Sequence, residues 1–485
     1  MTIHELEPRI VWDNFYGITR QPRPSKHEEK IRKYLLDWAA DRNIEAFADE
    51  TGNVIMRVPA TPGYEDRKGV ILQGHMDMVP QKNAGNDHDF ENDPIETVVE
   101  GDWLKAKGTT LGADNGLGVA FALSVLESPD VKHGPLELLV TYDEETGMSG
   151  AGALKPGVLK GDILLNLDSE AEGELYVGCA GGLDASATAG YKRCRTPRGY
   201  KTWRLAVTGF KGGHSGMDII LGRANANKVG ARILNALMSK AGAKLVAFEG
   251  GTLRNAIPRE SFATVCIPAD KVAKAVRAAR KEFACIKAEY AATDPDASMS
   301  FESCAKGERF CVEDGAAKRF INAILACPDG VERMSDAVPG LVETSDNMAM
   351  VYIGEGRAFI KSLLRSSVDS AKEALAVKMA AVFTLAGMKV SFSGGYSGWA
   401  PNADSPILRT MKDVYKDLFG SEPKVMAIHA GLECGILGGT YPHWDMISCG
   451  PTLLSPHSPD ERAYIPSVPK MWKYLKAVLE NIPRK

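Results

Sequence analysis

The chain has 485 residues, of which 44% are apolar, and a net charge of only −4 with acidic and basic residues interspersed. This length suggests roughly three domains with full hydrophobic cores, and without a basic stripe we expect no nucleic-acid partner. The segment "MTIHELEPRIVWDNFYG" lacks a signal-peptide pattern, and no apolar run of about 18 residues predicts a membrane span. Nine scattered cysteines without a C-x-x-C pair favour the reducing cytoplasm.

The first 182 residues alternate between helical and extended patterns. Ser25 and Glu28 have the spacing of a capping box, which predicts a helix over "KHEEKIRKYLLDWAADRN". Three short apolar runs bounded by glycine or proline predict buried strands: "GVILQG", "PLELLVTY" and "DILLNL". This alternation is typical of an α/β fold in which a mostly parallel sheet has helices on both faces.

Residues 183–397 have a different order of elements. A strand pattern over "TWRLAVTGF" is followed by helix, strand, strand, helix and strand, and the same series of five occurs again, ending at "KVSFSGG". The repeat predicts an inserted α+β lid domain of two split-βαβ, ferredoxin-like units in tandem. The α/β pattern resumes after "SGGYSGWAPNADSP", so residues 1–182 and 398–485 are predicted to form one catalytic domain around the insertion.

Acidic and histidine side chains follow the predicted strands of the first domain. In an open α/β sheet, ligands gather outside the carboxyl ends of the strands, so we expect these side chains to converge. Three strands are followed by His75 and Asp77, by Asp143, Glu144 and Glu145, and by Asp168. Two further candidates are Asp114 in the turn "GTTLGADNGLGVA" and His457 in the loop "SCGPTLLSPHSPDE".

Imidazole and carboxylate donors without thiolates suit a catalytic zinc site, with manganese and cobalt as alternatives. Asp114 is the only acid in its loop, and we predict that it bridges two divalent ions about 3.5–4 Å apart. The remaining predicted ligands are two for each ion: His75 with Asp168, and Glu145 with His457. Adjacent side chains in an extended segment point to opposite sides, so one of Glu144 and Glu145 is left free to act as a base.

Eight motifs in order span nearly the whole chain, among them "LQGHMDMVPQ", "YDEETGMSGA", "GGHSGMDI" and "RNAIPRE". Together they resemble the aminoacyl-histidine dipeptidase family, also called Xaa-His dipeptidase, peptidase D or carnosinase-like, within the co-catalytic zinc peptidases. The turn "ADNG" and the segments "GCAGG" and "HAGLECG" favour this branch. The resemblance implies a dinuclear zinc metallopeptidase that hydrolyses unblocked dipeptides, preferentially Xaa-His and including β-alanyl-histidine.

The resemblance also implies roles for single residues. Glu144 is implied to be the general base, which takes a proton from the attacking water and delivers it to the leaving amine. Asp77 is expected to orient the imidazole of His75. In the insertion, His214 is implied to stabilise the oxyanion. Three residues are implied to contact the substrate backbone and its carboxylate: Asn255, Arg365 and Gly431.

Two other classes of function stay open: a related amidohydrolase that deacylates N-acyl amino acids, and a non-catalytic peptide-binding protein on the same fold. The complete set of acids and histidines counts against the non-catalytic class. The segment "GHSGM" is no serine-hydrolase elbow, because Gly216 directly follows Ser215. A homodimer stays open, and the long insertion predicts that His214 acts within its own chain. The histidines interpreted as ordinary surface or core residues are His4, His27, His88, His133 and His443.

Overall fold

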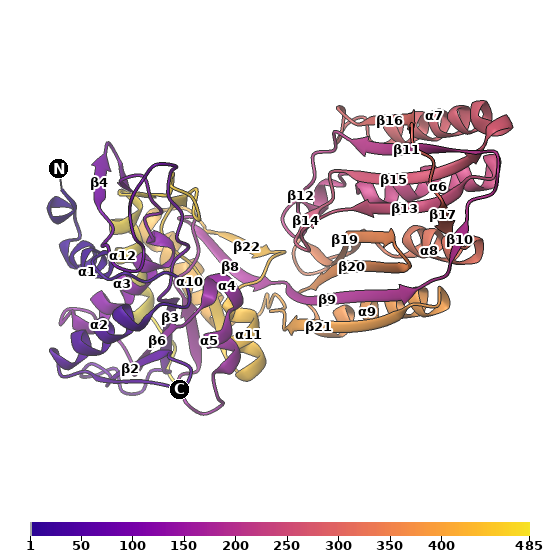
Figure 1. The fold of residues 1–485 in the computed structure, drawn as a ribbon. Helices are drawn as coiled ribbons and strands as arrows, with labels where there is room; N and C mark the ends of the chain where they lie inside the picture. Colours follow the sequence, from indigo (N-terminus) through magenta and orange to yellow (C-terminus); the bar gives the residue numbers. More distant parts are fainter. Residues whose placement is uncertain (1) are drawn as a thin grey trace. The chain divides into compact units, whose positions relative to one another are not determined.

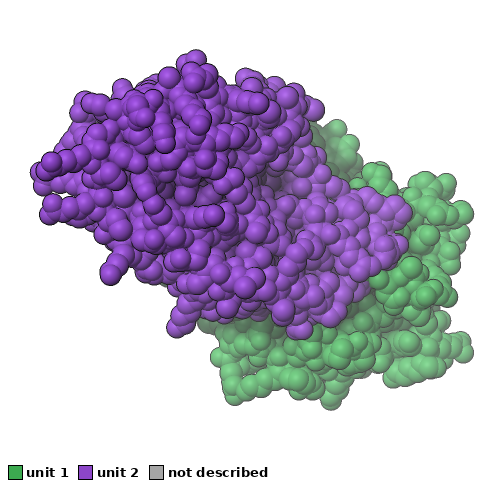
Figure 2. Space-filling view, turned by 90° about the vertical axis from the view of Figure 1, so that its right-hand side faces the viewer, with its two compact units in different colours: residues 1–178, 401–427, 432–485 green, residues 179–400, 428–431 purple. Residues whose placement is uncertain are grey.

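The structure, a computed structural model, describes residues 2–485 of the chain. The chain divides into two compact units, which are coloured separately in Figure 2. Unit 1 comprises Met1–Gly178, Pro401–Ala427 and Leu432–Lys485, and unit 2 comprises Cys179–Ala400 and Ile428–Gly431. Within the described part of the chain, no helix combines the length and the apolar character that crossing a bilayer requires. Each unit has its own sheet and its own hydrophobic core.

Unit 1 is built around an eight-stranded sheet in the order β1-β2-β6-β3-β7-β23-β8-β22 (Figure 1). Its four central strands, β6, β3, β7 and β23, run parallel, while β1, β2 and β8 pair antiparallel with their neighbours. The predicted α/β class is confirmed, and the carboxyl ends of the parallel strands share one edge. The strands are β1 Glu45–Ala48, β2 Val54–Val58, β3 Val70–His75, β6 Leu136–Thr141, β7 Ile163–Asn166, β8 Glu174–Cys179, β22 Lys424–Ile428 and β23 Asp445–Ser448.

Helices cover both faces of this sheet. Val70 and Leu72 of β3 belong to the core of the larger helical layer, whereas Ile71 between them is buried against the opposite face. Gln73 points the same way as Ile71 and bonds Glu433 of helix α11. The larger layer contains α1 Arg9–Thr19, α2 Glu29–Ala40, α3 Ala113–Glu127, α10 Pro406–Phe419 and α12 Ser467–Glu480. The opposite side carries α5 Ser149–Ala153 and α11 Glu433–Thr440.

Helix α2 begins at Glu29, and its start has no side-chain cap. The Ser25 hydroxyl donates instead to Asp77 Oδ2 at 2.8 Å, and Glu28 Oε1 accepts from the backbone N–H of Lys26 at 2.9 Å. The capping-box prediction is wrong because Lys26 takes a left-handed conformation, with φ of 71°, which separates Ser25 from the helix. The polar side chains before α2 therefore contact other loops of unit 1.

Unit 2 contains a nine-stranded antiparallel sheet in which β16-β11-β15-β13-β19-β20-β9-β21 lie side by side and β18 pairs with β19. The ferredoxin-like strand order occurs twice, as β16-β11-β15-β13 and as β21-β9-β20-β19, and the β13–β19 pair joins the halves. The principal strands are β9 Gly181–Gly190, β11 Tyr200–Thr208, β13 Lys244–Gly250, β15 Ser261–Pro268, β16 Ser298–Ser303, β18 Gly330–Met334, β19 Val342–Gly354, β20 Arg357–Ser366 and β21 Lys389–Tyr396.

The two halves of unit 2 are nested, so the prediction of a tandem arrangement is wrong. Strand β9 precedes the whole first half in sequence but pairs with β20 and β21 of the second half. Its sequence "GGLDASATAG" consists mostly of small residues, which gives no apolar strand pattern. The helices that bury the core of this sheet are α6 Ala226–Ala241, α7 Val272–Glu289, α8 Asp314–Ala326 and α9 Asp369–Leu385.

Small sheets and turns complete both units. In unit 1 a four-stranded sheet contains β4 Thr97–Glu100, β5 Trp103–Ala106, β24 Leu453–Leu454 and β25 Arg462–Tyr464. In unit 2, β10 Arg193–Arg195 pairs with β17 Phe310–Val312, and β12 Gly213–His214 pairs with β14 Ala256–Ile257. The β12–β14 pair places the turn around His214 next to the segment that contains Asn255.

Candidate active site

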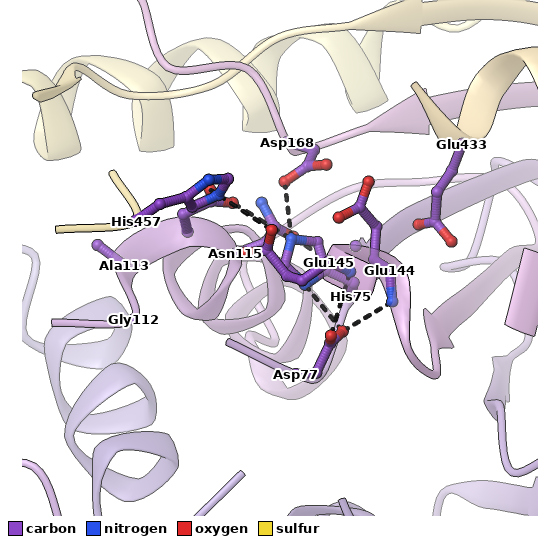
Figure 3. Close-up of polar contacts among 12 residues, drawn as sticks. His75, Asp77, Gly112, Ala113, Asn115, Glu144, Glu145, Asp168, Glu433 and His457 are labelled. Atoms are coloured by element: carbon purple, nitrogen blue, oxygen red, sulfur yellow. Dashed lines mark hydrogen bonds and ion pairs between the residues drawn. The ribbon is translucent and has the colours of Figure 1, made fainter. Parts of the chain in front are cut away.

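The five predicted ligands come together at the carboxyl edge of the unit 1 sheet. Figure 3 labels four of them: His75, Glu145, Asp168 and His457. Each central parallel strand leads to one of them, directly for His75, Glu145 and Asp168 and through a longer loop that contains β24 for His457. The strand-borne ligands are His75 at the end of β3, Glu145 after β6, Asp168 after β7 and His457 after β23. The fifth, Asp114, lies at the start of α3, where its extended backbone interrupts the helical path.

Asp114 lies between two imidazoles. Its Oδ1 is 3.2 Å from His75 Nε2, and its Oδ2 is 3.1 Å from His457 Nε2. The Nε2 of His75 is also 3.4 Å from Asp168 Oδ1, and the Nε2 of His457 is 3.0 Å from Glu145 Oε2. The side chains thus form two groups of three that share Asp114, which is the grouping expected from the sequence.

These side chains fit divalent cations. The donor atoms of His75, Asp114 and Glu145 lie within 4.8 Å of one another, and Glu145 Oε1 is buried without a hydrogen-bond donor among residues 2–485. Buried carboxylates of like charge are costly unless a cation balances them. Two imidazoles and three carboxylates without thiolate form a donor set that suits zinc, manganese or cobalt.

Burial and the close spacing of the carboxylates also shift the pKa values of the cluster. Burial raises the pKa of Asp168 to about 6, and the charges of Asp114 and Glu145 add to this effect. Burial disfavours the protonated ring of His75, but Asp168, Asp114 and Asp77 together raise the pKa of His75 well above its ordinary value. The site therefore attracts positive charge, and metal ions compete with protons for the same atoms.

Asp77 lies behind His75. Its Oδ1 is 3.3 Å from His75 Nδ1, and its carboxylate accepts from the Ser25 hydroxyl and from the backbone N–H groups of Glu144 and Glu145, the last two at 3.0 and 3.2 Å. Burial alone would raise the pKa of Asp77, but the contacts with His75, Ser25 and Glu144 lower it to about 2. A charged Asp77 fixes the proton of His75 on Nδ1 and leaves Nε2 free for a ligand.

The two glutamates after β6 lie in a helical turn. Asp143 has a left-handed φ of 53° and leads into α4 (Glu144–Gly147), so the expectation that both residues lie in extended backbone is wrong. Glu145 contacts His457, whereas the carboxylate of Glu144 lies between Asp168 and Glu433 in Figure 3. Burial raises the pKa of Glu144 well above its ordinary value, and the charges of Asp168 and Glu433 add to the shift.

Glu433 is a buried acid of this site that the sequence analysis did not identify. Its Oε2 accepts from Gln73 Nε2 at 2.6 Å and from the Thr141 hydroxyl at 2.7 Å, while its Oε1 has no donor among the described residues. Burial raises its pKa to about 8. The segment "HAGLECG" contains Glu433, but the sequence pattern indicated only the family branch and a role for Gly431.

In unit 2, Arg365 is a buried cation without an acidic partner. Its side chain is 5% exposed, its Nε donates to the Ser215 hydroxyl at 3.4 Å, and its Nη1 donates to the Tyr396 hydroxyl at 3.3 Å. Both partners are neutral, and no carboxylate of the described chain forms an ion pair with Arg365. Tyr396 reaches Arg365 across Gly182, where a Cβ atom would lie 2.5 Å from the tyrosine ring. A buried guanidinium of this kind suits a carboxylate ligand.

His214 has one defined tautomer. Its Nδ1 accepts from the backbone N–H of Met217 at 3.0 Å and of Gly216 at 3.3 Å, so the ring proton of the neutral form is on Nε2. Burial and then the charge of Arg365 lower the pKa of His214. The ring is therefore a neutral hydrogen-bond donor, which is the property that an oxyanion-stabilising group needs.

His429 was also missed by the sequence analysis. It is 6% exposed, its Nε2 is 2.7 Å from the Ser345 hydroxyl, and its carbonyl passes where a Cβ atom on Gly216 would lie, at 2.1 Å. Ser345 is opposite Arg365 in the β19–β20 pairing, so His429 and Arg365 belong to one polar group in unit 2. The remaining predicted residues are Asn255, which is exposed and whose carbonyl accepts from Ser215, and Gly431, which is partly exposed.

Residues 71–481 match the family described as "Peptidase family M20/M25/M40". The chain is 44% identical over 483 residues to the cytosol non-specific dipeptidase of Escherichia coli (strain K12), covering 100% of this chain and 99% of that protein. The crystal structure of aminoacylhistidine dipeptidase from Vibrio alginolyticus matches with a TM-score of 0.95 and 47% identity, over 100% of this chain and 99% of the other. Aminopeptidase PepT from Bacillus cereus, with a TM-score of 0.57, 17% identity and coverage of 98% and 99%, shares the fold alone. The chain therefore belongs to the M20/M25/M40 family of peptidases.

Proposed function

We propose that this protein is a metal-dependent dipeptidase that hydrolyses unblocked dipeptides, preferentially Xaa-His and including β-alanyl-histidine. The observation that carries the proposal is Asp114 lying between His75 and His457, each of which has one further carboxylate beside it. The names of the two most similar proteins described above, a cytosol non-specific dipeptidase and an aminoacylhistidine dipeptidase, support the same activity.

Two divalent ions, when bound, polarise the scissile carbonyl and lower the pKa of water. Their proposed ligands are His75, Asp114, Glu145, Asp168 and His457. Glu144 removes a proton from the attacking water and delivers it to the leaving amine. The raised pKa of Glu144 fits a group that keeps a proton between these steps. Asp77 holds the tautomer of His75, so that Nε2 stays available.

Unit 2 supplies the proposed contacts with the substrate. The Nε2–H of His214 donates to the developing oxyanion, and Arg365 binds the terminal carboxylate of the dipeptide. Asn255 and Gly431 are proposed to contact the peptide backbone. On this assignment the catalytic domain is residues 1–182 and 398–485, and the lid and substrate-binding domain is residues 183–397. Zinc is the proposed native metal, and the cytosolic name of the relative supports a cytoplasmic location.

A substrate screen tests the proposal. Protein stripped with a chelator is reloaded with zinc, manganese or cobalt and offered Xaa-His dipeptides, non-His dipeptides, a C-terminally amidated dipeptide and an N-acetyl amino acid. We expect hydrolysis of the free dipeptides, fastest for Xaa-His, and weak or no hydrolysis of the other two. Hydrolysis of the N-acetyl amino acid alone identifies the amidohydrolase alternative, and metal binding without any hydrolysis identifies a binding protein.

A further inference from the structure

Arg23 is a buried arginine whose partners are the loops that carry the proposed ligands. It is 2% exposed and donates to the carbonyls of Met76 and Asp77, at 3.0 and 2.7 Å, and of Gly112. The first two carbonyls directly follow His75, and the third lies two residues before Asp114. A planar guanidinium presents five donors in a rigid fork and so holds both loops at once, whereas a lysine has three donors on a single nitrogen.

The loop of Asp114 leaves space for this arginine. A Cβ atom added to Gly112 or to Gly116 would lie 2.6 Å from the Nη2 of Arg23, so the guanidinium would have to move from its present contacts. Gly112 also has a left-handed φ of 69°, which favours glycine. The absence of side chains at Gly112 and Gly116, on either side of Asp114, therefore leaves room for the guanidinium of Arg23.

Glu461 holds the same loop through its backbone N–H groups, whereas Arg23 holds it through a carbonyl. Glu461 is 2% exposed, and its two carboxylate oxygens accept four successive backbone N–H groups. The donors are Leu111 at 2.8 Å, Gly112 at 3.0 Å, Ala113 at 2.8 Å and Asp114 at 3.2 Å. Residues 111–114 are thus fixed through their N–H groups by Glu461 and through a carbonyl by Arg23.

The segment that contains Arg23 reaches a third ligand-bearing loop. The Ser25 hydroxyl donates to Asp77, and Glu28 Oε1 accepts from the backbone N–H of Asp143 at 3.2 Å, immediately before the turn of Glu144 and Glu145. Neither side chain caps helix α2, although their spacing predicts that they do. The contacts of residues 23–28 are thus directed at the loops after β3 and β6.

We infer that Arg23 and Glu461 are positioning residues that hold Asp114 and His75 in the geometry that two metal ions require. The inference rests on the proposed function, because it takes these side chains as metal ligands. Outer partners of metal ligands typically change metal affinity by about 10- to 100-fold. On charge alone, removal of Arg23 strengthens cation binding, because a positive group beside the site disappears. A positioning role predicts instead that removal of Arg23 weakens cation binding. Substitution of Arg23 therefore distinguishes a positioning role from a purely electrostatic one.

The test measures zinc affinity of chelator-stripped protein by competition with a chromophoric chelator, together with thermal unfolding of the same metal-free protein. We expect Arg23→Met to bind zinc at least about 10-fold more weakly than the unchanged protein. The control is Arg67→Met, because Arg67 also donates to a carbonyl, that of Ile482 at 2.7 Å, but precedes the amino end of β3. This control is expected to lose thermal stability without losing zinc affinity. Unchanged or tighter zinc binding in Arg23→Met overturns the inference.

Two further variants keep the test decisive if Arg23→Met does not fold. Arg23→Lys keeps the charge but not the fork, and it is expected to weaken zinc binding as well. Glu461→Gln, which loses half of its acceptor capacity, is paired with Glu137→Gln, because Glu137 Oε2 accepts the N–H groups of Lys160 and Gly161 at the amino edge of the sheet. The inference is overturned if Arg23→Lys and Glu461→Gln bind zinc as tightly as Glu137→Gln and the unchanged protein. An unchanged protein that binds no zinc instead contradicts the proposed function.

Discussion

The polar group around Asp114 in unit 1 and the polar group around Arg365 in unit 2 carry buried charge of opposite sign. In unit 1 acids outnumber bases around Asp114, and the buried oxygens Glu145 Oε1 and Glu433 Oε1 have no donor among residues 2–485. In unit 2 the buried cation Arg365 has only hydroxyl partners. An uncompensated buried charge is costly, so its presence indicates a ligand of the opposite sign. The group around Asp114 therefore indicates cations, and the group around Arg365 indicates an anion such as a peptide carboxylate.

The largest expected effect separates catalysis from metal binding within unit 1. Glu144→Gln removes the base without removing a ligand, so kcat should fall by roughly 10² to 10⁴-fold or more while both ions stay bound. Asp114→Ala removes the shared carboxylate and should release metal. Metal analysis of each purified variant, next to its kcat, checks both statements. A fully active Glu144→Gln protein would sink the assignment of the base.

The next largest effect tests whether His214 of unit 2 contributes to kcat without contributing to metal binding. His214→Ala removes a neutral Nε2–H donor, so we expect kcat to fall by about 10² to 10³-fold, the range for one oxyanion donor. Metal content should stay the same. His443→Ala, at an exposed position outside both polar groups, is the matched control and should keep full activity.

A mixing experiment shows which chain supplies His214. Because unit 2 contains two ferredoxin-like halves in one chain, we expect His214 to act within its own chain. Mixed His214→Ala and Glu144→Gln chains should therefore stay inactive. Recovery toward a fraction of the unchanged activity would show instead that the histidine comes from another subunit.

A smaller effect tests the anion site of unit 2. Arg365→Met should lower kcat/KM for a free dipeptide by about 10- to 100-fold, the value of hydrogen bonds to a charged group. Amidation of the dipeptide should cost the unchanged enzyme a similar factor. The two changes remove the same interaction, so together they should cost little more than either alone. Additive losses would mean that Arg365 does not bind the carboxylate.

Sequence patterns indicated three of the five proposed ligands because each lies at or just after the end of a short apolar strand. His75, Glu145 and Asp168 come within four residues of the ends of β3, β6 and β7, and the parallel arrangement brings these ends together. The positioning residues had no such signal. Arg23 meets carbonyls 53 and 89 positions away, and Glu461 meets amides about 350 positions away, so only the folded chain brings them together.

The polar group of unit 2 was predicted less completely for a similar reason. Arg365 was implied by family resemblance, but Tyr396 and His429 reach it from other parts of the chain. Strand β9 carries Gly182, whose missing side chain makes room for Tyr396, and this strand of small residues has no apolar pattern. Residues that act by leaving space give the weakest signal in a single sequence.

The smallest expected effect is the pH dependence of stability, which compares His429 of unit 2 with His75 of unit 1 in metal-free protein. Burial, followed by the charge of Arg365, lowers the pKa of His429 to about 3, whereas an unfolded histidine titrates near 6.5. Between these values the unfolded histidine binds the proton more readily, so the contribution of His429 to the stability of unit 2 should fall as pH decreases from about 6.5 toward 3. The pKa of His75 is raised, so its contribution to unit 1 is present below about 6.5 and is lost as pH rises.

Hydrogen exchange followed by mass spectrometry can resolve this contrast, because peptides from each unit report separately on local opening. In metal-free protein, acidification from pH 7 to 5, after correction for intrinsic exchange rates, should weaken protection around His429 in unit 2 and strengthen it around β3 in unit 1. His429→Gln should flatten the response of unit 2 alone, because glutamine keeps a polar contact with Ser345 but does not titrate. His443→Gln should leave both responses as they are. If protection around His429 and protection around β3 respond to acid with the same sign, the two polar groups are not oppositely charged, and the comparison between them fails.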